Sequence, residues 1–168
     1  MTIVALSNAA TPRARRAVPA LRDALPESPS VRHHVSETAD TADAVISGTD
    51  WRPDDLLVIN GGDGSVQRAL TLLLDARGAD RLPRIACLPG GSTNMTAFDI
   101  NDHRRYRDCL VSLRRLAANP DALPDAPRPV VRVASPSLAP APCGLFFGAG
   151  TIVDGVEYFQ TRLRGNGG

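Results

Sequence analysis

The distribution of apolar positions predicts that short strands and amphipathic helices alternate along the first 118 residues. Short runs of strand length predict strands over residues 2–7, 31–35, 56–59 and 84–88. Apolar positions that recur at helical spacing predict helices over residues 12–25, 38–48, 66–74 and 102–118. Pro19 falls inside the first of these helices and is expected to kink or restart it. Strands that alternate with helices predict an α/β fold with a doubly wound, mostly parallel sheet.

A proline-rich stretch separates this part of the chain from its C-terminal part. Prolines are concentrated between residues 119 and 142, where they flank a short predicted strand over residues 130–134. This composition indicates a connector or a domain boundary. After it, residues 143–150 and 151–153 are predicted as further strand material, and residues 155–164 as the beginning of a helix.

The strand predicted over residues 56–59 is followed by three glycines within four positions, in the sequence Asn60-Gly61-Gly62-Asp63-Gly64-Ser65. Glycine allows the backbone to turn sharply and a ligand to approach it closely. A strand, a glycine turn and a helix together present free backbone N–H groups to an anion, usually phosphate. Because phosphate gains nothing from a carboxylate, Asp63 is expected to hold a metal ion or to accept a hydroxyl proton. The alternative is a tight turn in which Asp63 caps a helix.

Two common phosphate-binding motifs do not fit this turn. A Walker A loop requires lysine after its last glycine, and Ser65 follows here. The dinucleotide fingerprint requires a third glycine three places after Gly64, where the chain has Gln67. The turn therefore belongs to neither class.

Two further polar turns follow predicted strands. Ser7-Asn8 ends the first strand, and a second glycine turn, residues 90–94, follows the strand over 84–88. Ligands of doubly wound sheets bind at the carboxyl ends of the strands. The candidate nucleotide-binding residues are therefore Ser7, Asn8, Gly61, Gly62, Asp63, Gly64, Ser65, Gly91, Ser92, Thr93 and Asn94.

The amino-acid composition excludes some reaction mechanisms and some classes of binding partner. The chain has 19 basic residues, all of them arginine, and a net charge of +1. The absence of lysine excludes Schiff-base chemistry and P-loop phosphate binding, and the low net charge argues against nucleic acid as a general partner. The arginines of residues 102–118 are interpreted as a solvated helix face, with a role at a membrane surface as the weaker alternative. Cys87, Cys109 and Cys143 lack metal-ligand spacing and are expected to be buried free thiols.

The N-terminal residues and the hydropathy of the chain predict its subcellular location. Residues 1–6 lack a basic flank and a cleavage site, so they are predicted as a strand rather than a signal peptide. No apolar run approaches the roughly 20 residues of a membrane span. The expectation is a cytoplasmic protein, with peripheral contact at the inner membrane face as a further expectation.

The two glycine turns resemble a known pair of motifs. Gly61-Gly62-Asp63-Gly64-Ser65 is similar to the GGDGT motif of the diacylglycerol kinase catalytic-domain superfamily, which includes bacterial lipid kinases, sphingosine and ceramide kinases and, more distantly, NAD kinases. The stretch at 88–97, Leu-Pro-Gly-Gly-Ser-Thr-Asn-Met-Thr-Ala, resembles the family's second motif, LPxGTxNDxA. Ser7-Asn8 lies where the family has its opening Asn-Pro turn. Residues 143–150 resemble the segment that opens the family's β-rich second domain.

This resemblance implies a function. The family fold is a nucleotide-binding α/β domain followed by a β-sandwich domain, with ATP between them. By resemblance, residues 1–125 would form the first domain, and residues 126–168 a connector with the incomplete beginning of the second. The implied reaction transfers the γ-phosphoryl group of Mg-ATP to a lipid hydroxyl, for example that of diacylglycerol. Asp63 would hold Mg²⁺ or help to deprotonate that hydroxyl, and the listed loop residues would bind the nucleotide.

The chain departs from the family pattern in three places and in length. Gln67 and Arg68 replace an Asn-Glu pair, Met95 replaces the acidic residue of the second motif, and Ala9 replaces the opening proline. The loss of two carboxylates would weaken metal binding, and Arg68 near phosphate would favour simple nucleotide binding. Few residues follow the connector compared with a typical second domain. The expectation is therefore a piece of a longer protein whose uncovered apolar surface promotes self-association.

Three functions remain open on the sequence. The first is a lipid kinase of the diacylglycerol kinase type, of which this chain is the N-terminal, ATP-binding part. The second is a non-catalytic nucleotide-sensing module of the same fold. The third is NAD kinase-like activity, which shares the first motif but not the second.

Overall fold

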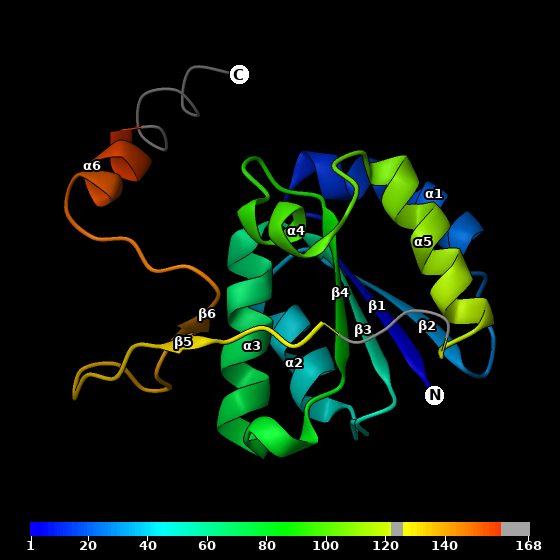
Figure 1. Cartoon of the computed structure of the whole chain (residues 1–168), viewed down its shortest axis with the longest axis horizontal. Helices are drawn as coiled ribbons and strands as arrows, with labels where there is room; N and C mark the ends of the chain where they lie inside the picture. The colour runs from blue at the N-terminus through cyan, green and yellow to red at the C-terminus, as the bar shows by residue number, and fades with distance from the viewer. Residues whose placement is uncertain (122–125, 159–168) are drawn as a thin grey trace.

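In the computed structural model, which describes residues 1–121 and 126–158, the chain forms one four-stranded sheet covered by helices on both faces (Figure 1). The strand order is β2-β1-β3-β4, and every neighbouring pair is parallel. The strands are β1 Ile3–Asn8, β2 Val31–Ser36, β3 Leu56–Gly61 and β4 Arg84–Pro89. The predicted doubly wound α/β fold is confirmed.

The helices return the chain between the strands. They are α1 Pro12–Ala24, α2 Ala39–Gly48, α3 Asp63–Arg77, α4 Met95–Ile100 and α5 Tyr106–Ala118, with a short 3₁₀ helix at Ala79–Arg81. Helix α1 runs through Pro19, so the helix does not restart at this proline. Thr38 caps α2, because its side chain accepts the N–H of Thr41 at 3.3 Å.

Alternate residues of each strand enter two separate cores. Val4 and Leu6 of β1 pack with α2 and α3 on one face of the sheet. Ile3 and Ala5 pack with α1 and α5 on the other face. This alternation follows from the pleat, which directs successive side chains to opposite faces. The sheet therefore lies between an α2–α3 layer and an α1–α5 layer, and the strand ends position the site.

One helix and two helix starts differ from the prediction, since α3 begins at Asp63 rather than at residue 66. Residues 95–100 form α4, which the sequence pattern did not indicate because a six-residue helix shows less than two turns of periodicity. Helix α5 begins at Tyr106 rather than at residue 102. Its inward residues are buried as predicted, among them Cys109, Leu110, Leu113 and Leu116.

The C-terminal part has less regular structure than predicted. Strands β5 Val131–Arg132 and β6 Cys143–Gly144 form a two-stranded antiparallel ribbon and are shorter than the predicted segments. Pro142 directly precedes β6 and Pro129 lies two residues before β5, and proline cannot donate to a strand ladder. Residues 151–153 are not a strand, since helix α6 spans Thr151–Tyr158. The predicted helix over 155–164 is described only as far as residue 158.

The ribbon is attached to α3. The backbone N–H of Cys143 donates to Thr71 Oγ1 at 2.9 Å, and the Thr71 hydroxyl donates to Gln67 O at 2.8 Å. Cys143 is buried, and Thr71 is also buried although it lies on a helix surface. The ribbon therefore covers the N-terminal half of α3, beside the first glycine turn.

Candidate functional site

The three predicted turns meet at the carboxyl ends of β1, β3 and β4. Asn8 Nδ2 donates to Ser65 Oγ at 3.0 Å, which joins the turn after β1 to the first glycine turn. Gly90 N donates to Gly61 O at 3.0 Å, which joins the two glycine turns. The convergence that the parallel sheet predicts is therefore present in the structure.

The glycines at this junction are required by close packing. A Cβ on Gly91 would lie 2.4 Å from the Cα of Gly62, and a Cβ on Gly61 would lie 2.6 Å from Ser65 Oγ. A Cβ on Gly90 would lie 2.9 Å from the backbone N of Gly61. Two backbone turns pass against each other here, so a side chain at 90 or 91 would force them apart.

Asn60 holds the base of the junction. Its side chain is fully buried, and Nδ2 donates to Ser7 Oγ at 3.0 Å and to Ala14 O at 3.0 Å. These bonds join the ends of β1 and β3 to the first turns of α1. Ser7, a predicted nucleotide ligand, is itself buried and directs its hydroxyl to Asn60.

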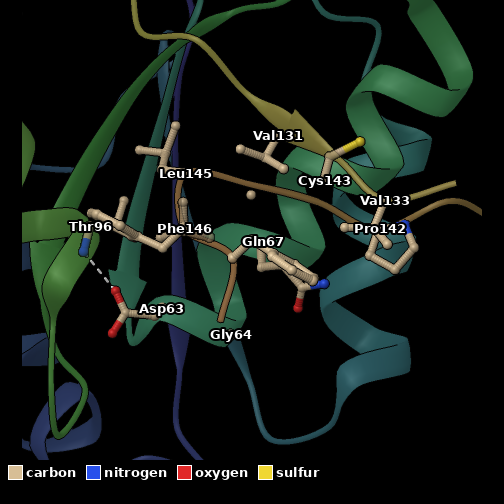
Figure 2. A pocket seen from close by; sticks show the side chains of 13 residues that line it. Asp63, Gly64, Gln67, Thr96, Val131, Val133, Pro142, Cys143, Leu145 and Phe146 are labelled. Carbon is tan, nitrogen blue, oxygen red and sulfur yellow. Dashed lines mark hydrogen bonds between the residues drawn. The ribbon is translucent and has the colours of Figure 1, made fainter. Parts of the chain in front are cut away.

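Asp63 faces the N-terminus of α4. Its Oδ1 accepts the N–H of Thr96 at 2.7 Å (Figure 2), and its Oδ2 accepts the N–H of Met95 at 3.1 Å. A carboxylate at this position satisfies free helical N–H groups and interacts favourably with the helix dipole. Asp63 therefore caps α4, the neighbouring helix, while it forms the first turn of its own helix α3.

The second glycine turn is held by Asn94. This residue is in the left-handed region at φ 56°, which asparagine tolerates better than most residues. Its Oδ1 accepts the N–H of Gly91 at 2.6 Å, and its Nδ2 donates to Gly91 O at 2.9 Å. The Asn94 side chain is buried and shapes the turn, whereas Ser92 and Thr93 are exposed at its tip.

Gly64 differs from the other glycines of the junction. A Cβ at this position would have no heavy atom within 4 Å, and its φ is not positive. Neither packing nor backbone conformation therefore requires glycine here. Gly64 lines two cavities, one on each side of the N-terminal turn of α3. The space above this glycine is open to a ligand from either side.

The first cavity is an apolar groove of about 410 Å³ beside Asp63. Figure 2 shows Asp63 and Thr96 at one end and the ribbon residues along the side. Its apolar lining comes from α3, from the ribbon and from the residues after it, namely Val66, Val131, Val133, Pro142, Leu145, Phe146 and Phe147. Phe146 and Phe147 are half or more exposed, at 48% and 65%.

The second cavity, of about 280 Å³, lies between the N-terminal parts of α2 and α3. Its polar lining is Asn8, Ser36, Glu37, Thr38, Ser65 and Arg68. Asn8 and Ser65 are among the predicted nucleotide-binding residues, whereas residues 36–38 are not. Residues 36–38 lie at the carboxyl end of β2, which lies next to β1, and this position could have indicated that they belong to the site.

Arg68 is held on the α2 side of this cavity. Its Nε and Nη2 donate to the two carboxylate oxygens of Asp43, so the pair is bidentate. This hydrogen bonding is the first cause of the raised pKa of Arg68. Asp43 therefore neutralises the charge of Arg68, which still lines the same cavity as Ser65.

The cysteines are buried free thiols, as predicted. Burial, and secondarily the negative charge of Asp63, raises the pKa of the Cys87 thiol from 9.0 to about 12. Cys87 lies in β4, and its carbonyl accepts Asn101 Nδ2 at 2.8 Å. The thiol beneath the site is therefore unreactive at neutral pH.

Within residues 1–121 and 126–158, no group of three or more His, Cys, Asp or Glu side chains could hold a metal ion by itself. Asp63 nevertheless fits the usual role in a Mg²⁺ site, in which one or two carboxylates act together with substrate phosphates and water. In the same part of the chain, no helix is long and apolar enough to cross a membrane.

The parallel sheet and the joined glycine turns define a doubly wound α/β domain of the NAD kinase and diacylglycerol kinase type. The family model of the diacylglycerol kinase catalytic domain matches residues 1–121, and the chain belongs to this family. The match ends in the segment that follows α5 and so covers the whole sheet and both glycine turns. No curated protein and no solved structure matches the chain. Residues 1–121 are thus a kinase-type catalytic domain.

Proposed function

We propose that this chain is the ATP-binding part of a lipid kinase that transfers the γ-phosphoryl group of Mg-ATP to a lipid hydroxyl. The observation that carries the proposal is the position of Gly64 between two cavities, one bordered by Asp63 and Thr96 and the other by Asn8, Thr38 and Ser65. Phosphoryl transfer requires a donor and an acceptor to approach one point from opposite sides. Neither packing nor backbone conformation requires glycine at position 64, so we interpret this residue as the point where donor and acceptor meet.

The second cavity, in which polar side chains accompany an apolar lining that includes Ile46 and Ile59, is proposed to hold the nucleotide. The half-buried Asn8 and Ser65, the exposed Thr38 and the buried Ser36 line it. The N-terminal turn of α3 directs its free N–H groups to this end of the sheet, where they would bind phosphate. The Asn8–Ser65 hydrogen bond fixes both side chains at the edge of the cavity.

The apolar groove is proposed to hold the acceptor. Its lining of valine, leucine and phenylalanine suits an acyl chain or another apolar group. Its polar end contains Asp63, whose carboxylate retains lone pairs beyond those used by Met95 and Thr96. This carboxylate would orient a hydroxyl there, accept its proton, or bind a metal ion together with the phosphates.

Mg-ATP would supply the phosphoryl group and the charge neutralisation that this chemistry needs. The residues of this chain would contribute positioning. The packed glycines fix the two turns, Asn60 fixes their base, and Asp63 fixes α4 against α3.

The proposal is tested in two steps. Addition of ATP and Mg²⁺ is expected to shift the amide resonances of residues 61–65, and of residues 36–38 around the second cavity. Radiolabelled ATP is then offered with diacylglycerol, with a mixed lipid extract or with NAD. The proposal would be overturned if ATP shifted neither the resonances of residues 61–65 nor those of residues 36–38.

A non-catalytic nucleotide-binding module remains the second candidate. The observation that favours it is Met95, which is half exposed at the N-terminus of α4, where the family motif has a carboxylate. In this case ATP would bind and none of the acceptors would be phosphorylated. Transfer to NAD but not to lipid would instead indicate NAD kinase-like activity.

A further inference from the structure

The positive charge of this chain is concentrated in one layer of the fold. Helix α1 and the segment 101–118, which contains α5, carry nine arginines and three aspartates, a net charge of +6. The net charge of the whole chain is +1, so the remaining residues carry −5. We call these nine arginines the basic face: Arg13, Arg15, Arg16, Arg22, Arg104, Arg105, Arg107, Arg114 and Arg115.

The basic face spans two neighbouring helices and keeps an excess of positive charge. Helices α1 and α5 lie side by side on one face of the sheet (Figure 1), and Arg114 Nη2 donates to Asp23 O at 2.7 Å between them. All nine arginines are exposed. None of them forms an ion pair with a described residue; the arginines that do so lie elsewhere. Arg104 stacks over the ring of Phe98 at 5.3 Å, which leaves its charge in place.

Helix stability does not explain this placement. Six of the nine arginines, at 13, 15, 16, 104, 105 and 107, lie in or just before the first two turns of α1 or α5. The N-terminal end of a helix carries a partial positive charge, so arginine is unfavourable there. Helix α1 has no acidic residue in its first turn to offset this. An external anion would offset the repulsion.

These helix ends lie close to the site. Helix α1 begins just after the carboxyl end of β1, and α5 follows α4, which begins after the glycine turn of β4. The six arginines therefore border the same end of the sheet as the two cavities. The acceptor groove lies on the α3 side of the sheet and the basic face on the α1–α5 side, so the two share only this end of the sheet.

We infer that the basic face binds the surface of an anionic lipid bilayer through its phosphate headgroups. Two helices of 13 residues, each about 20 Å long, form a broad surface that suits a bilayer. Val111, 43% exposed, lies one turn from Arg107 and from Arg114 and Arg115, where it would contact the headgroup region.

Nucleic acid fits this surface less well. Recognition of bases uses aromatic rings and side-chain amides, and neither α1 nor α5 contains Asn or Gln. Tyr106, the only aromatic residue of the two helices, is half-buried and its hydroxyl lies inside the protein.

The inference of bilayer binding rests on the proposed function only in that a lipid kinase would take its acceptor from the bilayer.

The test is co-sedimentation of the chain with vesicles. Binding is expected to equimolar phosphatidylglycerol–phosphatidylcholine vesicles, to weaken as salt is added, and to be absent from phosphatidylcholine vesicles. Each arginine near an anionic surface contributes about fivefold to partitioning. The triple variant Arg15→Gln, Arg22→Gln, Arg107→Gln is therefore expected to bind about a hundredfold more weakly.

A matched control variant distinguishes the effect of the basic face from the effect of net charge. Arg32, Arg52 and Arg81 are exposed outside the basic face, and their replacement by Gln changes the net charge equally. This control is expected to bind vesicles like the unchanged chain. Equal weakening of both triple variants, equal binding to both vesicle types, or tighter binding to a DNA duplex or single-stranded RNA at the same salt would overturn the inference.

Nucleotide binding is measured separately in each variant. The ATP-dependent shifts of residues 61–65 are expected to be unchanged, which also shows that the triple variants are folded. If ATP fails to bind but vesicle binding follows the basic face, the proposed function falls and this inference stands. If ATP binds and vesicles do not, the inference falls and the proposed function stands.

Discussion

The carboxylate of Asp63 accepts the backbone N–H of Thr96 at 2.7 Å and thereby joins the two glycine turns of this domain. Asp63 lies in the first turn of α3, and Thr96 lies in the first turn of α4. One side chain thus positions the helix that follows the second turn while it faces the apolar groove (Figure 2). The two interpretations of Asp63 from sequence, a helix cap and a group with a chemical role, are compatible.

Substitution Asp63→Asn is expected to affect both stability and transfer. Asn retains one oxygen acceptor but loses the charge that interacts with the α4 dipole, so the free energy of unfolding should fall by about 1 kcal/mol. Phosphoryl transfer should be lost, since the amide can neither accept a proton nor bind a metal ion well. Urea unfolding and radiolabelled transfer measure the two effects.

Asp40→Asn is the matched control for this substitution. Asp40 lies in the first turn of α2 and is exposed. Its replacement should change stability by less than about 0.5 kcal/mol and leave transfer intact. Full transfer by Asp63→Asn would exclude a role for this carboxylate in the reaction.

Two glycine-to-alanine substitutions should separate packing from ligand access. In Gly91→Ala the new Cβ would meet the Gly62 backbone at 2.4 Å, so we expect a loss of about 3 kcal/mol or more. In Gly64→Ala the Cβ meets nothing within 4 Å, and alanine favours the helix by up to about 1 kcal/mol. Thermal unfolding should show opposite shifts for the two variants.

Gly64→Ala should nevertheless bind ATP at least tenfold more weakly, because the methyl group occupies the space where phosphate approaches the backbone. Isothermal titration measures this affinity. A more stable variant with unchanged ATP affinity would show that no ligand approaches Gly64 closely.

The Arg68–Asp43 pair should contribute modestly to stability. The pair is bidentate, but its side chains are 46% and 26% exposed, so solvent screens it. A double-mutant cycle of Arg68→Gln and Asp43→Asn is expected to give a coupling of about 0.5–1 kcal/mol. If Arg68 contacts phosphate instead, Arg68→Gln will lower ATP affinity much more than it lowers stability.

Cys87 predicts a loss of stability at alkaline pH. The pKa of its thiol is about 12 in the folded chain and about 9 when exposed, so between these values the unfolded state releases a proton that the folded state retains. The free energy of unfolding should therefore be unaffected by this group below pH 9 and fall by up to about 1.4 kcal/mol per pH unit above it. Urea titrations across this range test the slope.

The variant Cys87→Ala should remove this part of the alkaline slope. The native chain should also resist alkylation at Cys87 at pH 8 and react once urea unfolds it. Rapid alkylation of Cys87 in the folded chain would contradict the burial on which the prediction rests.

Local patterns determined much of the fold and located the site. The periodicity of β1, β3, α3 and α5 reflects the faces that they bury, and the parallel order follows from the alternation of strands and helices. The same order implied that the turns after β1, β3 and β4 converge. The sequence alone therefore determined the fold class, the family resemblance and the position of the glycine turns.

The tertiary structure decided what each side chain does at that position. Asn94 and Ser7 are turned inward, Asp63 caps a helix more than thirty residues away, and Arg68 is taken by Asp43 from α2. These partners are distant in sequence, and no periodicity encodes which of two neighbouring polar groups a side chain reaches. The two cavities at Gly64 and the basic face likewise exist only because packing brings separate elements together.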